Sequence, residues 1–203
     1  LGILCAIFLA FFGSNRVAKI AKAGVQLLAG IPSVVYGFFG LVVLVPFIRE
    51  NFGGTGQSIL CASLVLGIMI LPTIITLSES ALKAVPEAYY EGALALGADH
   101  ERSVMRVMLP AAISGVLASI ILAIGRAIGE TMAVIMIAGN QVQMPDAITD
   151  GIRTLTANIV LEMGYAADLH RGALIGTACV LFVFILIINF AFSALKKKGR
   201  NNG

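Results

Sequence analysis

The apolar positions of this chain form long runs that shorter polar segments separate. The runs cover residues 1–12, 34–48, 58–77, 111–138 and 172–195. A helix needs about 20 mostly apolar residues to cross a bilayer, so we expect the first run to be the end of a truncated span. The pattern predicts an all-α integral membrane protein, a polytopic helical bundle of about five spans with the first one truncated.

Two prolines interrupt these runs, Pro32 just before the second and Pro72 inside the third. Proline kinks a membrane-spanning helix or divides it into half-helices. A half-helix that begins at Pro32 would direct backbone N–H groups at an anion. A kink that serves packing alone is the favoured interpretation, and the half-helix stays open as the alternative.

The polar segment 86–110, which we call the elbow, has the pattern of two short helices joined at a tight corner. Pro86 suits a first helical position, where its missing N–H has no cost. Gly97 can adopt the left-handed conformation that ends a helix, and Asp99 can cap the next helix. Pro110 predicts a break before the following apolar run.

Two further segments are expected to form amphipathic helices. Basic residues recur three apart in Arg16–Leu28, which suits a helix at the cytoplasmic surface. In the polar segment 140–171, apolar residues recur at helical spacing, and a short helix is expected to lie on the membrane or to tuck back into the protein. These residues are Ile148, Ile152, Leu155 and Ile159.

Composition and charge agree with a membrane protein. Hydrophobic residues make up 59% of the chain and charged residues 12%, more apolar surface than a soluble domain can bury. The net charge is +3, and Lys and Arg gather in residues 16–22, 83–106 and 196–200. The positive-inside rule places these segments, including the elbow and the C-terminus, inside and residues 140–171 outside. No basic stripe with interleaved aromatics suggests nucleic acid.

Several kinds of chemistry lack their sequence signals. The three cysteines have neither metal-site spacing nor the pattern of a disulfide framework. His100 and His170 lie in polar segments outside the spans and are expected to be exposed loop residues. No zinc-protease, serine-hydrolase or ATP-binding motif is present, which argues against a membrane-embedded hydrolase. We therefore expect neither catalysis nor a cofactor nor a metal in this chain.

One apolar run contains charge. Arg126 and Glu130 lie four residues apart in run 111–138, so one helix face would carry both, beside a Gly-x-x-x-Gly pair at Gly125 and Gly129. A charge at the bilayer centre costs about 2.5–3.5 kcal/mol, and such residues are commonly functional. The planar guanidinium suits tetrahedral oxyanions. A transport-path role is favoured over a pair that only neutralises itself.

The elbow resembles the EAA loop of ABC-importer permeases. The resemblance is carried by Glu91-Gly92-Ala93, then Gly97, then nine intervening residues and Val107-x-Leu109-Pro110. Gly92 stands where the family pattern has Ala, and Val107 where it has Ile. The resemblance implies that the elbow docks on a cytoplasmic ATPase; a hairpin without a partner is the alternative.

Two further stretches resemble phosphate-specific ABC permeases, the PstC-type subunit more than its PstA-type partner. They are Gly125–Val134, which includes Thr131, and Ile31–Gly37. The resemblance implies that Arg126 and Glu130 take part in phosphate translocation. It also implies a bundle of the type I ABC-importer permease kind, with residues 1–203 forming one transmembrane permease domain.

The function implied is that of the membrane subunit of an ATP-driven phosphate importer in the bacterial inner membrane. Its implied partners are a PstA-type permease subunit, two ATPase subunits inside and a phosphate-binding protein outside. The alternatives are an importer for another oxyanion, the PstA-type subunit itself, or a passive channel.

Overall fold

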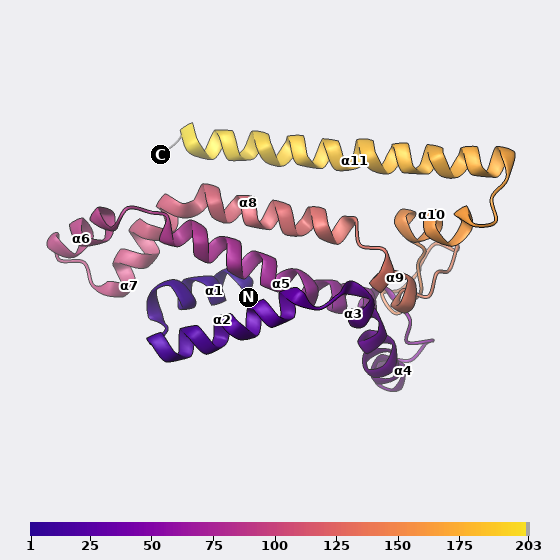
Figure 1. Cartoon of the computed structure of the whole chain (residues 1–203), viewed down its shortest axis with the longest axis horizontal. Coiled ribbons are helices and arrows are strands. Elements are labelled where there is room, and N and C mark those ends of the chain that lie inside the picture. Colours follow the sequence, from indigo (N-terminus) through magenta and orange to yellow (C-terminus); the bar gives the residue numbers. More distant parts are fainter. Residues whose placement is uncertain (202–203) are drawn as a thin grey trace. The chain divides into compact units, whose positions relative to one another are not determined.

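The computed structural model describes the backbone of residues 1–201 and the side chains of residues 1–192. Its described part is helical apart from the connections and one isolated bridge between Gly139 and Ile152. In chain order the elements are α1 (Gly2–Ile7), η1 (Phe8–Phe12), α2 (Asn15–Gly30), α3 (Ser33–Phe39), η2 (Gly40–Leu44), α4 (Val45–Phe52), α5 (Ile59–Lys83), α6 (Glu87–Ala95), α7 (His100–Ser103), η3 (Val104–Met108), α8 (Leu109–Ile128), α9 (Met132–Ile137), α10 (Leu155–Met163) and α11 (Asp168–Asn201). The elements named η are π-helical turns. Figure 1 labels the α-helices along the chain.

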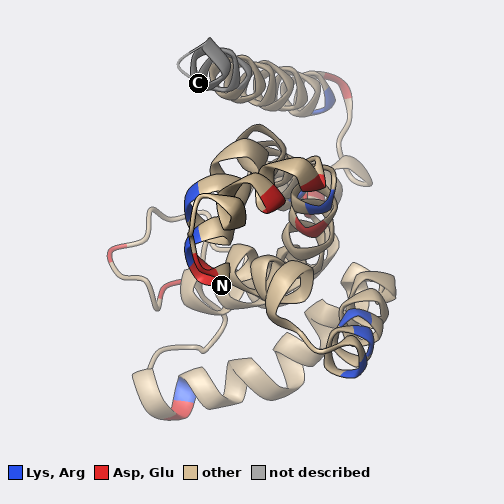
Figure 2. Cartoon of the chain, turned by 90° about the vertical axis from the view of Figure 1, so that its left-hand side faces the viewer, with Lys and Arg blue, Asp and Glu red and all other residues tan. Residues whose placement is uncertain are grey.

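The described helices confirm the all-α, polytopic fold. Four are long and apolar enough to cross a membrane, namely Ser33–Phe52, Ile59–Lys83, His100–Ile128 and Asp168–Phe192. Gly2–Phe12 is a shorter apolar helix, as expected for the first run. Charged positions gather mainly at helix ends and in connections, and long uncharged stretches lie between them (Figure 2). The basic side chains of residues 196–200, on which the predicted inside position of the C-terminus partly rests, lie outside the described side chains.

The chain divides into two compact units. The first consists of Leu1–Gly30, Ile70–Ile124 and Ala191–Gly203, and the second of Ile31–Met69 and Gly125–Phe190.

The first unit is built on the pairing of α5 with α8, which lie side by side (Figure 1). A Cβ added at Gly115 would approach the Ala81 Cβ to 2.5 Å, so the missing side chain permits this close approach. Ser119 Oγ donates to the Val116 carbonyl, and Ser78 Oγ lies 2.7 Å from Ser119 Oγ, which leaves Ser78 as the donor between them. The two buried hydroxyls thus satisfy each other across the helices.

Apolar and ionic contacts join the N-terminal helices to this pair. The apolar cluster contains Ala6, Ile7, Leu82, Val104, Ala112 and Val116. The Glu79 carboxylate, only 3% exposed, accepts from Lys22 Nζ at 3.1 Å and from Lys83 Nζ at 2.7 Å. Because a buried carboxylate is stable only with partners, this contact links α2 to α5.

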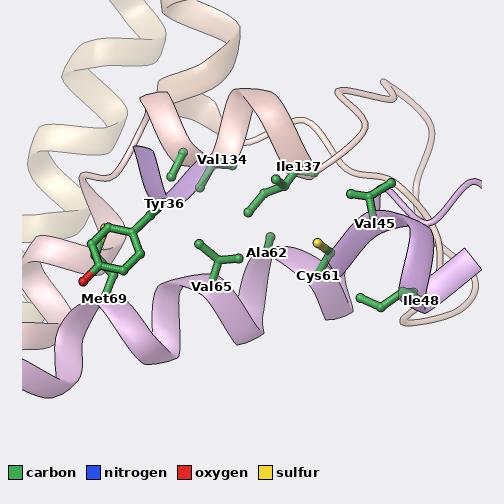
Figure 3. Packing of buried hydrophobic residues seen from close by; sticks show 11 residues of the cluster. Tyr36, Val45, Ile48, Cys61, Ala62, Val65, Met69, Val134 and Ile137 are labelled. Atoms are coloured by element: carbon green, nitrogen blue, oxygen red, sulfur yellow. The ribbon is translucent and has the colours of Figure 1, made fainter. Parts of the chain in front are cut away.

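The second unit has its own core, shown in Figure 3, between α3, α4, the first half of α5 and α9. Its buried residues include Tyr36, Val45, Ile48, Cys61, Ala62, Val65, Met69, Val134 and Ile137. A Cβ added at Gly37 would lie 2.8 Å from the Ala133 Cα. This glycine therefore lets α3 and α9 pack backbone against backbone.

The predicted amphipathic helix is confirmed only in its second half, since α10 begins at Leu155. Residues before it tuck back onto the start of α5, where the Ile148 carbonyl accepts from the Leu60 N–H at 2.9 Å and the Asp150 carbonyl from the Ile59 N–H at 3.0 Å. The Asp150 carboxylate accepts the N–H groups of Asp146 and Ala147 and holds this segment in a turn. These carbonyls satisfy the donors that a helix N-terminus leaves unpaired.

The prolines act differently from one another. Pro32 stands between α2 and α3, where the sequence predicts an interruption and leaves a kink or a half-helix open, whereas Pro72 lies inside α5. The predicted break at Pro110 is wrong, because one helix runs from His100 through to Ile128. The π-helical turn η3 ends just before Leu109 and Pro110. In this turn the Leu109 N–H bonds the Val104 carbonyl, five residues back. We attribute the unbroken helix at Pro110 to this wider turn. It changes the distance between the proline ring and the preceding carbonyl with which the ring would otherwise clash.

Candidate functional site

The elbow folds as its sequence predicts. Gly97 has φ +85°, its N–H donates to the Leu94 carbonyl at 2.9 Å, and the Ala98 N–H donates to the Ala93 carbonyl at 3.1 Å. This is the Schellman pattern that ends a helix. Asp99 then caps α7, since its Oδ1 accepts the Arg102 N–H at 2.7 Å. Two helices therefore meet at a corner set by hydrogen bonds between near neighbours.

The candidate coupling residues lie on different sides of this corner. Glu91 and Gly92 are exposed, and a Cβ at Gly92 would meet nothing within 4 Å. Ala93 is buried against its own chain, so it contributes to the packing of α6 rather than to its outer face. The apolar side chain that α6 leaves most open is its cap, Leu96, which is 92% exposed.

The remaining coupling candidates stand where the elbow joins the span. Leu109 is half-buried and Pro110 is exposed, both in the first turn of α8. Pro86 is the cap before α6 rather than its first residue, one position earlier than predicted.

The predicted shared helix face of Arg126 and Glu130 is wrong. Helix α8 ends at Ile128 and α9 begins at Met132, so Glu130 stands in a break between two helices. The Glu130 N–H bonds the Ala127 carbonyl at 3.2 Å in a tightened last turn. We call residues 129–131, which lie between the two helices, the helix break.

Glu130 uses both its side chain and its backbone to hold this break. Its Oε1 accepts the Ala133 N–H at 3.1 Å, so the carboxylate caps α9, where the helix dipole favours negative charge. Its carbonyl accepts from Thr156 Oγ1 at 3.3 Å, which joins the break to α10. The carboxylate thus has a fixed position that is set by the backbone of α9.

Arg126 and Thr131 flank this carboxylate along the chain. Arg126 is exposed in the last turn of α8, where the helix dipole favours a cation. Thr131 is the cap residue of α9, and its Oγ1 donates to the Gly129 carbonyl at 3.2 Å.

The Gly-x-x-x-Gly pair does not bring helices together in the described chain. A Cβ at Gly125 would meet nothing within 4 Å, and one at Gly129 would meet only carbonyls of α8. The close helix contacts are made instead at Gly37 and Gly115. No local signal distinguishes these glycines, because the contact depends on which residue lies opposite.

His100 is the functional candidate that the sequence prediction missed. Instead of an exposed loop residue it is half-buried at the start of α7. Its Nδ1 lies 2.8 Å from the Tyr90 hydroxyl and its Nε2 lies 3.2 Å from the Phe11 carbonyl. The ring also contacts Phe12 edge-on, with centroids 4.8 Å apart.

Comparison with known proteins gives a family match over almost the whole chain. The model of the family "Binding-protein-dependent transport system inner membrane component" matches residues 2–201. The probable ABC transporter permease protein YqgH of Bacillus subtilis is 40% identical over 97% of this chain and 66% of its own length. The phosphate transport system permease protein PstC of Haemophilus influenzae is 32% identical over 90% of this chain and 64% of its own length. The chain thus spans slightly less than two thirds of these relatives.

Solved structures show the same fold. An inward-facing MetNI methionine ABC transporter superposes with a TM-score of 0.75 at 21% identity, over 98% of this chain and 85% of that one. A bacterial alginate ABC transporter gives a TM-score of 0.68 at 15% identity, over 95% of this chain and 71% of that one. At these identities the likeness shows the fold alone, which is that of type I ABC-importer permeases.

Proposed function

We propose that this chain, which belongs to the family of binding-protein-dependent transport system inner membrane components, is the permease subunit of an ATP-driven phosphate importer. Proteins of this family are multi-pass transport subunits, not enzymes. Phosphate is proposed as the substrate because this chain is 32% identical to the PstC proteins of Haemophilus influenzae and Mesorhizobium japonicum, over 90% and 93% of its length.

Phosphate translocation is assigned to Arg126, Glu130 and Thr131. Phosphate carries negative charge and must shed water to cross, so its path needs a permanent cation, and a guanidinium binds oxyanions through paired N–H groups. Arg126 is exposed at the end of α8. Glu130, held by the Ala133 N–H, would place a fixed negative charge that limits how tightly the anion binds.

Coupling to ATP hydrolysis is assigned to the elbow. Glu91, Gly92, Gly97, Leu109 and Pro110 form its proposed coupling set, with Ala93 packing α6 from within. An ATPase groove could approach the bare Gly92 closely, and the exposed Leu96 side chain offers apolar contact area. The corner at Gly97 would transmit force because its hydrogen bonds keep α6 and α7 at a set angle.

The rest of the proposal concerns partners and orientation. The single permease domain 1–203 would pair with a PstA-type subunit in the bacterial inner membrane, surrounded by lipid. Two ATPase subunits would bind inside, and a phosphate-binding protein would bind outside. The C-terminus would lie inside.

The decisive experiment is co-purification with the ATPase and PstA-type subunits, followed by reconstitution into vesicles. ATP turnover stimulated by the loaded phosphate-binding protein, together with phosphate uptake, is the expected result. Another oxyanion is the second candidate substrate, since the name of the 40% identical YqgH specifies no substrate. ATP turnover stimulated by sulfate or molybdate with their binding proteins, and not by phosphate, would assign that oxyanion. Uptake without nucleotide would show a passive channel.

A double variant distinguishes a translocation role of the charged pair from a structural one. Arg126→Met with Glu130→Leu removes both charges while keeping side-chain volume. A structural pair predicts that each single change impairs assembly and that the double variant restores it. Full assembly with no uptake is the expected result. Restored uptake would show that Arg126 and Glu130 take no part in phosphate translocation.

Labelling tests the orientation. In a background without the native Cys5, Cys61 and Cys179, a cysteine at position 150 should react with an impermeant thiol reagent applied outside. A cysteine at position 100 should react only after the membrane is opened. The reverse pattern would overturn the positive-inside assignment.

A further inference from the structure

We infer that His100 is a positioning residue that ties the elbow to the C-terminal end of the N-terminal helix Gly2–Phe12. Through this tie, movement of the elbow would move the end of that helix. The inference rests on the proposed coupling of the elbow to an ATPase. It is based on contacts within the first compact unit.

The first observation is the acceptor that His100 uses. A helix leaves its last four carbonyls without partners inside the helix. Phe11 lies in the last turn of η1, which ends at Phe12 before the extended Gly13. The Phe11 carbonyl lies 3.2 Å from Nε2 of His100, a residue 89 positions further along the chain. A residue of the elbow therefore caps the end of a helix near the N-terminus of the chain.

The second observation fixes the ring itself. A carbonyl only accepts, so Nε2 must carry the proton that bonds Phe11. In the neutral ring Nδ1 is then the acceptor for the Tyr90 hydroxyl, 2.8 Å away on α6. One tautomer satisfies both bonds, and His100 thereby connects α6, α7 and η1. Edge-on contacts with Phe12 and Tyr90, at centroid distances of 4.8 Å and 5.8 Å, support the same orientation.

The third observation is that packing alone does not hold the ring in place. His100 and Tyr90 line a cavity of about 360 Å³ together with Phe11, Lys83 and Glu87. Space on that side would let the ring rotate if the hydrogen bonds were absent. Lys83 lines the same cavity, but its ammonium donates to Glu79 at 2.7 Å, and no bond from it to the ring is found among the described residues. The position of the ring is therefore set mainly by Tyr90 and Phe11.

The tie is separable from the folding of this unit. The apolar cluster of Ala6, Ile7, Val104 and their neighbours joins the N-terminal helix to η3 without His100. The salt bridge of Lys22 with Glu79 joins α2 to α5 independently. Loss of the imidazole should thus leave a folded protein whose helix end follows the elbow less closely.

The test uses the assembled transporter in vesicles and measures ATP hydrolysed per phosphate imported. His100→Ala should raise this ratio roughly fivefold or more, the lower end of typical coupling between sites. His100→Gln, which keeps one donor and one acceptor, should restore most of the coupling. Tyr90→Phe, which removes one hydroxyl, should give a smaller rise. His170→Ala, an exposed histidine at the start of α11, is the matched control and should leave the ratio unchanged.

A second measurement does not depend on transport. Amide hydrogen exchange of residues 8–13 in the purified chain should be faster in His100→Ala than in His170→Ala. An unchanged ratio, or losses of assembly and uptake in proportion at a constant ratio, would overturn the coupling role. If His100→Ala fails to assemble, Tyr90→Phe decides between these outcomes. If the wild-type transporter shows no ATP-driven phosphate uptake, the proposed function and this coupling role fail together, whereas the exchange experiment still decides whether the tie exists.

Discussion

The elbow and the helix break each interrupt helical structure beside polar residues, yet different contacts hold them. At the corner of the elbow, the Schellman bonds at Gly97 and the cap from Asp99 join residues no more than five positions apart, and the distant bond of His100 to Phe11 lies after this corner. At the break, Glu130 caps α9 locally, but its carbonyl also accepts from Thr156, 26 positions away. Local bonds can keep a surface in one shape, whereas distant contacts let a site change as its neighbours move.

The two regions also present different groups. The elbow exposes the bare backbone at Gly92 and the apolar Leu96, which suit a protein groove. Beside the break, Arg126 lies at a helix C-terminus, and within it Glu130 places a carboxylate at a helix N-terminus; both suit the handling of an anion. We therefore expect substitutions in the elbow to affect ATPase binding, and substitutions at the break to affect transport in a complex that still assembles.

The largest effect on uptake by a complex that still assembles is expected from Arg126→Gln. Removing charge-assisted hydrogen bonds costs about 1.5–3 kcal/mol, so phosphate uptake should fall roughly 10–100-fold or more while assembly persists. Arg126→Lys should also be poor, because an ammonium cannot make the paired contact. Uptake by vesicles is the measurement, with Arg171→Gln at the exposed start of α11 as the control. Normal uptake in Arg126→Gln would erase the functional contrast between the regions.

Gly92→Trp tests the other side of the comparison. The indole would fill the open space beside α6 and block close approach of a partner, so ATPase binding and uptake should be lost with membrane insertion intact. Gly92→Ala is the matched control, since it restores the Glu-Ala-Ala pattern and adds about 1 kcal/mol of helix propensity. Co-purification of the ATPase is the measurement, and undiminished binding by the Trp variant would refute docking at this face.

Gly97→Val tests whether the corner depends on local conformation. A branched residue at φ +85° costs about 1–2 kcal/mol, so thermal unfolding should begin earlier and ATPase affinity should decline. Asn tolerates this conformation, and Gly97→Asn should behave almost as the parent. If the Val and Asn variants lose the same stability, the left-handed backbone is not the cause.

The smallest effect is expected from removing the cap of α9. Glu130→Ala loses the acceptor for the Ala133 N–H and should destabilise the complex by about 1 kcal/mol. Glu130→Gln keeps an acceptor oxygen, so its stability should stay close to the parent while uptake falls. Thermal unfolding and uptake, measured together, separate the two roles. Equal stability losses in both variants would show that the charge, not the cap, holds the break.

Much of the elbow was predictable because its signals lie close together in the chain. Gly97 and Asp99 each act within a few residues of their partners. Pro110 was wrongly predicted to break the helix, because the wider turn η3 that precedes it has no signal in the sequence. His100 was missed for a different reason. Its ring bonds the Phe11 carbonyl, which lies 89 positions away in the sequence, so no local pattern indicates the contact.

The sequence by itself determined the membrane class, the approximate extent of the apolar helices and the corner of the elbow. Only the tertiary structure decided that run 111–138 breaks at Glu130, that Ile148 lies in a turn and that Gly37 and Gly115 make the close helix contacts. An apolar run is compatible with one helix or two, because hydrophobicity depends on side chains and not on backbone direction. Where the backbone can stop being helical depends on which distant groups, such as Thr156, satisfy the polar atoms that the break exposes.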